Sequence, residues 1–228
     1  MSVVDLTPQA ASPRTQSAGF RRLATALGLA VVAVPGIASV RAHIGAPGDM
    51  DAARFVDLLG HSMAVLFLFA AMSCTVLSLA PRHRIHGWRA TTSALCGSFL
   101  LISFNFLPRI ELSGAAGMLS SGLVVGGYLA ALVTIARLGR SFSILPAARR
   151  LVTDGPYALV RHPLYLAEEL AAFGLFLHYQ SLVAGLILAL HLLFQLDRMH
   201  QEELVLRTAF PDYATYAART KRLLPGIF

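Results

Sequence analysis

The sequence is poor in charge. Only 14% of its 228 residues are charged, whereas a soluble domain usually carries about 25%. Hydrophobic residues make up 56% of the chain, and the mean hydropathy is +0.63. A core of this size cannot hide so much apolar surface from water, so lipid is the expected solvent for the excess. The shortage of charge therefore excludes an ordinary soluble domain.

Cysteine is almost missing too, because Cys74 and Cys96 are the only two and both lie inside apolar runs. A disulfide framework is thereby excluded, and both thiols are expected to behave as small buried hydrophobes. Acidic residues are also few, which leaves a formal net charge of +7. A nucleic-acid-binding domain would gather its arginines on one soluble face, but here they stand in short clusters between apolar runs. Nucleic acid is excluded as a partner, and membrane lipids are expected to surround the chain.

What the sequence does contain is long apolar runs. A membrane-spanning helix needs about 20 predominantly apolar residues. Four runs meet this requirement, at about 23–40, 58–80, 90–107 and 117–136. A fifth apolar region, 164–196, is too long for one crossing and is interrupted by His178-Tyr179-Gln180-Ser181. We predict that it forms two helices in a tight hairpin, so that the fold is an all-α polytopic membrane helix bundle with five to six crossings.

The chain divides into three regions. Residues 1–19, rich in Pro, Ser, Thr and Gln, are expected to be a disordered tail. Residues 20–136 hold four transmembrane helices, and residues 137–228 hold the hairpin and a C-terminal segment. Arg21-Arg22 before the first run would suit a signal peptide, but the length of that run and the spans after it favour an uncleaved helix.

The distribution of charge along the chain predicts the topology. With six crossings, the segments on the side of the N-terminus hold 16 of the 19 lysines and arginines. The positive-inside rule places that side in the cytoplasm. Both termini are therefore predicted to be cytoplasmic. The arginine-rich composition, with a single lysine, is typical of a bacterial chain, so the expected membrane is a bacterial inner membrane.

Polar groups are sparse before residue 137. His61 and Asn105 lie within predicted spans, where a hydrogen-bonded packing role is expected for each. Gly122 and Gly126 form a small-xxx-small pair that permits close contact with a neighbouring helix. These features predict packing rather than chemistry.

Chemical groups gather from residue 137 onward. Asp154-Gly155-Pro156 is a turn signal, and Pro163 fits the first turn of a helix, where its missing N–H costs nothing. His162 then lies near the N-cap of that helix, at the membrane surface. Tyr165, three residues further, shares roughly the same face.

Carboxylates follow in both helices of the hairpin. Glu168 and Glu169 lie within a membrane-embedded helix, where ionisable groups are costly and tend to face a cavity or a partner; solvation at interfacial depth is the alternative. Arg198 and Glu202 are four residues apart and so lie on one face of the second helix, as a functional pair or as an ordinary surface ion pair. The hairpin brings them back toward the start of its first helix. We predict one pocket mouth where basic, acidic and aromatic groups converge.

The polar stretches come in a distinctive order. Gly155-Pro156-Tyr157 is followed by Arg161-His162-Pro163-x-Tyr165, Arg198-x-x-x-Glu202-Glu203, Tyr213-x-x-Tyr216 and Leu224-Pro225. In this order and spacing, residues 130–228 resemble the isoprenylcysteine carboxyl methyltransferase family, within the wider group that includes phospholipid N-methyltransferases. The resemblance implies an S-adenosylmethionine pocket that is closed by the C-terminal segment and opens to the cytoplasm. It also implies that a lipid acceptor arrives through a tunnel from the bilayer.

The resemblance implies roles for individual residues as well. Arg198 would face the reacting group of the substrate, and Arg198, Glu202 and Glu203 would be the catalytic residues, with no metal ion. The residues implied in cofactor binding are Arg150, Leu151, Val152, Tyr157, His162, Pro163, Leu164, Tyr165 and Glu202. Two features depart from the family pattern: Ala167 replaces a common glycine, and the 143–150 region is shorter than in eukaryotic members.

The acceptor and two other functions stay open at this point. The acceptor is expected to be a lipidic or prenylated small molecule or peptide that is methylated on a carboxylate, and the amine of a phospholipid headgroup is the alternative. Sterol-type membrane reductases carry a similar Arg-His-Pro-x-Tyr stretch but use NADPH, and a non-enzymatic membrane protein is the remaining alternative. The Arg198-x-x-x-Glu202-Glu203 pattern favours a methyltransferase. A polar cluster at one mouth is also unlike a transport site, which usually lies at the bilayer midplane.

Overall fold

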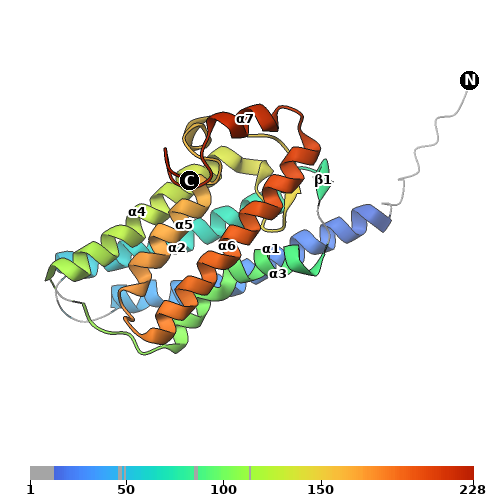
Figure 1. Ribbon diagram of the computed structural model, residues 1–228. Helices are drawn as coiled ribbons and strands as arrows, with labels where there is room; N and C mark the ends of the chain where they lie inside the picture. Colours follow the sequence, from blue (N-terminus) through green and yellow to red (C-terminus); the bar gives the residue numbers. More distant parts are fainter. Residues whose placement is uncertain (1–12, 46–47, 49, 85–86, 113) are drawn as a thin grey trace, which may run out of the picture.

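The chain folds into a bundle of helices, which Figure 1 shows. The computed structural model describes residues 13–45, 48, 50–84, 87–112 and 114–228. Its α-helices are α1 (Pro13–Gly45), α2 (Ala52–Val76), α3 (Trp88–Phe99), α4 (Gly114–Leu138), α5 (Pro163–Phe176), α6 (Leu182–Ala209) and α7 (Tyr213–Arg219). Shorter elements are the 3-10 helices η1 (Leu100–Phe106), η2 (Gly139–Ser141) and η3 (Gly155–Ala158), and the strands β1 (His83–Arg84) and β2 (Ala147–Ala148). The predicted tail, residues 1–19, falls mostly on residues 1–12, which lie outside the described residues.

Four helices are long and apolar enough to cross a membrane. Their apolar segments are Leu23–Gly45, Arg54–Val76, Gly114–Ser141 and Leu182–Ala209. Large apolar side chains point outward from them, as expected of helices that contact lipid: Val31, Leu129 and Leu193 are each more than half exposed. The prediction of an all-α polytopic membrane bundle is confirmed, and the chain is an integral membrane protein. The number of crossings and the side of each terminus stay predictions.

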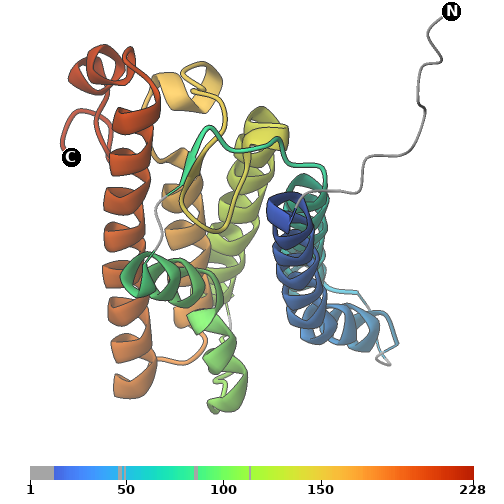
Figure 2. The ribbon, with the colours of Figure 1, turned by 90° about the vertical axis from the view of Figure 1, so that its right-hand side faces the viewer.

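The apolar run at 90–107, predicted to be a span, is not one continuous α-helix. α3 ends at Phe99, and the chain continues as the 3-10 helix η1. The 12 residues of α3 reach only about 18 Å, which is short of the roughly 30 Å of a bilayer core. Figure 2 shows α3, in green, lying across α6 rather than along it. Gly97 permits this crossing, because a Cβ atom there would lie 3.0 Å from Gln195 Oε1.

The hairpin predicted for residues 164–196 is present. α5 ends at Phe176, and Ser181 caps α6 by accepting a 3.1 Å hydrogen bond from the backbone N–H of Ala184. Gln180 adopts a φ angle of 37°, a left-handed conformation that helps the chain reverse direction. α5 has only 14 residues and packs inside the bundle against α4 and α6.

α4 and α5 make the tightest helix contact, through glycines other than the predicted pair. Ser120 Oγ donates a 2.7 Å hydrogen bond to the Gly174 carbonyl, and a Cβ atom on Gly174 would lie 2.8 Å from the Ser120 carbonyl oxygen. A Cβ atom on Gly127 would lie even closer to the backbone of α5, at 2.6 Å from the Ala171 nitrogen. The predicted close contact through Gly122 and Gly126 is wrong, because both are exposed and nothing lies within 4 Å of their Cβ positions.

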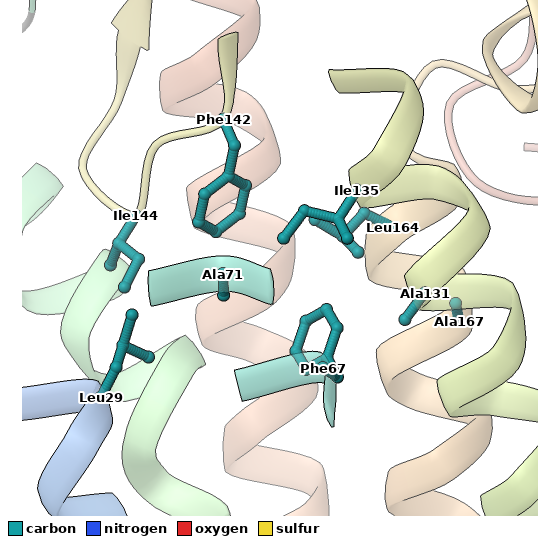
Figure 3. Close-up of a cluster of buried hydrophobic side chains, with 9 residues drawn as sticks. All are labelled: Leu29, Phe67, Ala71, Ala131, Ile135, Phe142, Ile144, Leu164 and Ala167. Carbon is teal, nitrogen blue, oxygen red and sulfur yellow. The ribbon is translucent and has the colours of Figure 1, made fainter. Parts of the chain in front are cut away.

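A buried apolar cluster joins α1, α2, α4 and α5 to the segment that follows η2. Its members are Leu29, Phe67, Ala71, Ala131, Ile135, Phe142, Ile144, Leu164 and Ala167. Figure 3 shows Phe142 and Ile144 reaching from that segment toward Ala71 of α2. The burial of these side chains fixes residues 141–152 against the end of the helices.

Backbone contacts hold the same segment from its other side. β1 and β2 pair in antiparallel orientation, with His83 opposite Ala148. Arg140 Nε donates a 2.8 Å hydrogen bond to the Leu77 carbonyl, just after α2. The link between α2 and α3 and the link between α4 and α5 therefore form one layer over this end of the bundle.

The C-terminal segment returns to the start of α5. Val160 and Lys221 form a parallel bridge, and the backbone N–H groups of Arg161 and His162 donate to the carbonyls of Lys221 and Arg222 at 2.8 and 3.0 Å. Figure 1 shows α7 and the C-terminus lying over the ends of α4, α5 and α6. This packing closes one end of the bundle and leaves a pocket beneath it.

Candidate active site

The pocket beneath α7 is built by segments from the last two fifths of the chain. Its wall consists of the end of α4, residues 141–152, η3, the start of α5, the last turns of α6, and α7. The lining residues are Leu138, Ser141, Phe142, Ser143, Ala147, Arg149, Arg150, Leu151, Val152, Tyr157, Arg161, His162, Leu164, Tyr165, Arg198, Glu202, Leu206, Tyr213 and Tyr216.

All but two of the predicted site residues line this pocket. The nine that do are Arg150, Leu151, Val152, Tyr157, His162, Leu164, Tyr165, Arg198 and Glu202. Pro163 and Glu203 are the exceptions. Pro163 is buried in the first turn of α5, where it starts the helix that presents its neighbours to the pocket.

Glu202 is the acidic group of the pocket. Tyr165 donates its phenolic O–H to Glu202 Oε1, and Arg198 Nε lies 3.8 Å from the same oxygen. The Glu202 side chain is 24% exposed and that of Arg198 only 3%. The i,i+4 pair therefore does not lie on a solvated surface: its carboxylate faces the open pocket, and its guanidinium lies deeper.

Arg198 closes the inner end of the pocket. Its guanidinium lies 4.8 Å from the centroid of the Tyr165 ring, and its Nη1 donates a 3.1 Å hydrogen bond to Ser98 Oγ. A buried charge requires such partners. Arg198 Nε makes no hydrogen bond within the described residues. The side chain therefore keeps a donor for a further ligand.

A second, mainly apolar cavity of about 260 Å³ lies inside the bundle. Helices α1 to α6 all contribute to its wall, with apolar residues such as Leu29, Phe67 and Leu175. Phe142 and Arg198 line both this inner cavity and the pocket beneath α7. The polar and the apolar space therefore meet at these two side chains.

Glu168 and Glu169 point into the bundle rather than into solvent. Glu168 lines the inner cavity and accepts a 2.8 Å hydrogen bond from Gln195 Nε2. Glu169 Oε1 lies 2.9 Å from His191 Nδ1, and both side chains are largely buried. The prediction that these carboxylates face a cavity or a partner is confirmed, and interfacial solvation does not describe them.

Glu203 is fully buried and does not line the pocket. Its Oε1 accepts hydrogen bonds from Arg161 Nε at 3.0 Å and Arg222 Nε at 3.1 Å, and His162 Nε2 lies 3.3 Å away. Arg222 Nη2 adds a 3.0 Å bond to Oε2. The Glu203 carboxylate is therefore occupied by these partners and ties α6 to the C-terminal segment and to the start of α5. The catalytic role that the resemblance implies for Glu203 stays a prediction, and its contacts favour a positioning role.

Tyrosines form the roof of the pocket. Tyr216 donates a 2.7 Å hydrogen bond to the Tyr157 carbonyl, and the rings of Tyr213 and Tyr216 meet edge to face at 6.0 Å. Burial raises the pKa of Tyr216 to about 12, and burial with the nearby Glu202 carboxylate raises that of Tyr157 well above its ordinary value. These phenols therefore stay neutral at physiological pH and act as aromatic walls and hydrogen-bond donors.

Several pocket residues were not predicted as site residues. Ser141, Phe142 and Ser143 reach the pocket because the turn after α4 folds back over it. No periodic pattern marks such a turn. Leu206 could have been found from its i,i+4 spacing to Glu202 on α6. Tyr213 and Tyr216 likewise share one face of α7 by their i,i+3 spacing.

The fold and the pocket define an integral membrane protein in which a polar site meets an apolar interior. The model of the isoprenylcysteine carboxyl methyltransferase (ICMT) family matches residues 119–208, from α4 through most of α6. Three curated proteins are similar over more than half of the chain. The chain is 33% identical over 163 residues to the cobalt-zinc-cadmium resistance protein CzcN of Cupriavidus metallidurans, covering 69% of this chain and 71% of that protein.

The nickel-cobalt-cadmium resistance protein NccN of Alcaligenes xylosoxydans xylosoxydans is 31% identical over 155 residues, covering 66% of this chain and 68% of that protein. The protein-S-isoprenylcysteine O-methyltransferase of Schizosaccharomyces pombe is 33% identical over 138 residues, covering 58% and 56%. The chain belongs to the isoprenylcysteine carboxyl methyltransferase family. It is therefore a membrane methyltransferase, which sets aside the reductase and the non-enzymatic alternatives.

Proposed function

We propose that the chain transfers a methyl group from S-adenosylmethionine to a lipidic acceptor, and that the acceptor atom is a carboxylate oxygen of an isoprenylcysteine-like molecule. One observation carries this proposal: the polar pocket and the apolar inner cavity meet at Arg198. A polar cofactor and a lipid can occupy separate spaces there. Their reacting groups still reach the same side chain.

The pocket offers S-adenosylmethionine one acidic group and several ring surfaces. Glu202 would hold the positive sulfonium or amino group, and the rings of Tyr157 and Tyr216 would pack on the adenine. The Tyr213 hydroxyl is buried and makes no hydrogen bond within the described residues, so it is available to a polar group in the pocket. S-adenosylmethionine, when bound, supplies a methyl group that its positive sulfur already activates.

Arg198 would orient the acceptor. A guanidinium can form two parallel hydrogen bonds to a carboxylate, and a carboxylate is ionised at neutral pH, so it needs no general base to attack. The protein then has to hold the two reactants about 3–3.5 Å apart and keep water out. Phe142 and Leu164, apolar and buried beside the pocket, serve the second purpose.

An amine acceptor is the alternative that the interior of the bundle also supports. Glu168 lines the same cavity as Arg198, and a carboxylate there attracts a cationic headgroup. A neutral amine loses a proton when it is methylated, and Glu168 or Glu202 would accept it. The substrate would then be the amine of a phospholipid headgroup instead of an isoprenylcysteine-like carboxylate.

Calorimetry on the detergent-purified protein tests the cofactor. Saturable binding of S-adenosylmethionine without binding of NADPH is the expected result. Transfer of labelled methyl to a small isoprenylcysteine acid, compared with a phosphatidylethanolamine, then separates O- from N-methylation. A folded protein that binds no S-adenosylmethionine would overturn the proposal.

We also propose that the protein acts in resistance to divalent transition metals. Two of the similar proteins are named for such resistance, one to cobalt, zinc and cadmium and the other to nickel, cobalt and cadmium. A strain that lacks the gene is expected to grow less well than its parent in the presence of cobalt or cadmium salts. Restoring the wild-type gene should recover growth, and restoring an Arg198→Ala gene should not. Equal metal tolerance of parent and deletion strains would exclude this context.

A further inference from the structure

Outside the methyltransferase pocket, two histidines and an aspartate gather where α1 meets α2. His43 belongs to the last turn of α1, and Asp57 and His61 lie one turn apart near the start of α2. His43 Nε2 lies 2.9 Å from Asp57 Oδ2, and His61 Nδ1 lies 4.0 Å from Asp57 Oδ1. One possible ligand atom from each residue lies within 4.8 Å of the others. Figure 1 shows the connection of α1 and α2 at the end of the bundle far from α7, so this cluster is separate from the pocket.

Backbone carbonyls fix the tautomers of both imidazole rings. His43 Nδ1 lies 2.8 Å from the Ser39 carbonyl oxygen, and His61 Nδ1 lies 2.9 Å from the Asp57 carbonyl oxygen. A carbonyl oxygen only accepts hydrogen bonds, so each Nδ1 carries a proton and each Nε2 of a neutral ring is a bare lone pair. Metal-binding histidines usually have this arrangement, with one ring nitrogen donating to a carbonyl and the other on the metal.

The contact between His43 and Asp57 requires a positive charge between its two atoms. When the His43 ring is neutral, its Nε2 and the carboxylate oxygen 2.9 Å away are both acceptors. A proton on His43 Nε2 or a bound cation removes the repulsion. A proton would involve only one ring, whereas the His61 ring is also present, with its centroid 5.1 Å from that of His43. A cation, unlike a proton, could be bound by both rings and the carboxylate together.

We propose that His43, Asp57 and His61 bind one divalent transition-metal ion of the zinc, cobalt or nickel class. Imidazole nitrogens suit such ions, whereas Mg²⁺ and Ca²⁺ prefer oxygen ligands. Bonds of about 2.0–2.1 Å place tetrahedral ligand atoms roughly 3.3 Å apart. Each side chain brings one possible ligand atom within 4.8 Å of the others, and a bound ion would draw these atoms together to that spacing. Three protein ligands leave a fourth position open.

Arg109 is compatible with this site. Its Nη2 lies 3.3 Å from Asp57 Oδ1 and 3.4 Å from the ring nitrogens of His178. The other carboxylate oxygen, Oδ2, faces His43 and stays available to an ion, while Arg109 holds the carboxylate as an outer partner. Asp57, His61 and Arg109 also line the inner cavity. The metal site therefore borders the space proposed for the lipidic acceptor, but the inference does not rest on methyl transfer.

Zinc titration of the full chain tests the site. The protein is purified in detergent with an affinity tag that contains no histidine, and ZnCl₂ binding is followed by calorimetry. The expected stoichiometry is one ion per chain, and CoCl₂ should give the visible absorption of tetrahedral Co²⁺. His61→Ala removes one ligand and leaves the contact of Asp57 with Arg109 in place. Its affinity for Zn²⁺ should fall by more than about 100-fold, since outer partners alone contribute 10–100-fold.

His83→Ala is the matched control, because His83 is exposed and lies on β1, at the other end of the bundle. This variant should bind Zn²⁺ as the wild type does. Zn²⁺ should also raise the Tm of the wild type and of His83→Ala, but not that of His61→Ala. His43→Gln, which keeps a polar side chain of similar length, should reproduce the loss if His61→Ala fails to fold. The proposal is overturned if the wild type binds no Zn²⁺ or Co²⁺, or if the His61 and His43 variants bind them as tightly as the wild type; the cluster is then a protonated His43 paired with Asp57.

Discussion

The two ends of the bundle differ in how much of their polar clusters lies within single helices. At the α7 end, two pairs lie one helical turn apart: His162 and Tyr165 at the start of α5, and Arg198 and Glu202 on α6. At the α1–α2 end, Asp57 and His61 form one such pair, and His43 joins them from another helix, 14 positions before Asp57. Pairs within one helix can be predicted from spacing, because helical geometry alone places their members together. Contacts between helices, such as Tyr165 with Glu202 or His43 with Asp57, depend on how the helices pack.

A finer comparison lies within α6, between the consecutive residues Glu202 and Glu203. Glu202 faces the pocket and pairs with Tyr165, while Glu203 is buried among arginines that belong to other segments. We therefore expect the two identical side chains to have different roles: ligand binding for Glu202 and stabilisation of the fold for Glu203. Variants at these positions should separate the two tasks.

Glu202→Ala is expected to have the largest effect. It removes the only acidic side chain that lines the pocket within the described residues. Hydrogen bonds to charged groups contribute about 1.5–3 kcal/mol each, so the affinity for S-adenosylmethionine should fall by at least about 10-fold and turnover should be lost. Calorimetry on the folded protein measures this. Glu111→Gln, at an exposed position, should bind normally, and unchanged binding by Glu202→Ala would remove Glu202 from the site.

Arg198→Ala should separate binding from turnover. The variant is expected to retain the cofactor, because Glu202 and the tyrosines remain, and to lose about 100-fold in turnover, because the acceptor is no longer aligned. A methyl-transfer assay at saturating cofactor measures the loss. Arg198→Lys should recover only part of it, since an ammonium cannot form the two parallel bonds of a guanidinium. Normal turnover in the alanine variant would discard the role of Arg198 in positioning the acceptor.

Glu203→Gln should act on stability rather than on chemistry. It leaves Arg161 and Arg222 without their counter-charge, and breaking a buried ion pair costs about 3–5 kcal/mol. The expected result is a lower Tm in detergent and faster proteolysis of the C-terminal segment. Arg207→Gln is the control, because its guanidinium is 60% exposed and lies 3.6 Å from Glu203; it should cost less than about 1 kcal/mol. A Glu203→Gln protein as stable as the wild type would contradict the positioning role.

The smallest effect is expected in the contact between α4 and α5. Gly174→Ala places a Cβ atom 2.8 Å from the Ser120 carbonyl oxygen, and such overpacking costs about 1–3 kcal/mol. Gly122→Ala meets nothing within 4 Å and should be neutral or slightly stabilising, because alanine favours a helix more than glycine does. Thermal unfolding of the two variants compares them directly. Equal Tm values would show that the close approach at Gly174 is not needed.

Much of the fold could be predicted because long apolar runs form helices in a membrane. Residues 164–196 were too long for one span and carried a polar interruption, and these two features together predicted the hairpin. The run at 90–107 is not a single α-helix, because α3 ends at Phe99 and the chain continues as a 3-10 helix, and neither this change nor the crossing of α3 over α6 leaves a trace in hydropathy. Likewise, Gly122, Gly126, Gly127 and Gly174 look alike in sequence, yet of these four only Gly127 and Gly174 face the backbone of a neighbouring helix.

The sequence by itself determined that lipid surrounds this protein, where most of its long helices lie, and which short motifs it shares with its family, because composition and helical spacing are local properties. Only the tertiary structure decided that Glu202 faces the pocket and Glu203 does not, and that His43 meets Asp57. The physical reason is that the 3.6-residue period of a helix sets the angle between its side chains. The absolute direction of each side chain, and the neighbour that it meets, are set by how the helices pack.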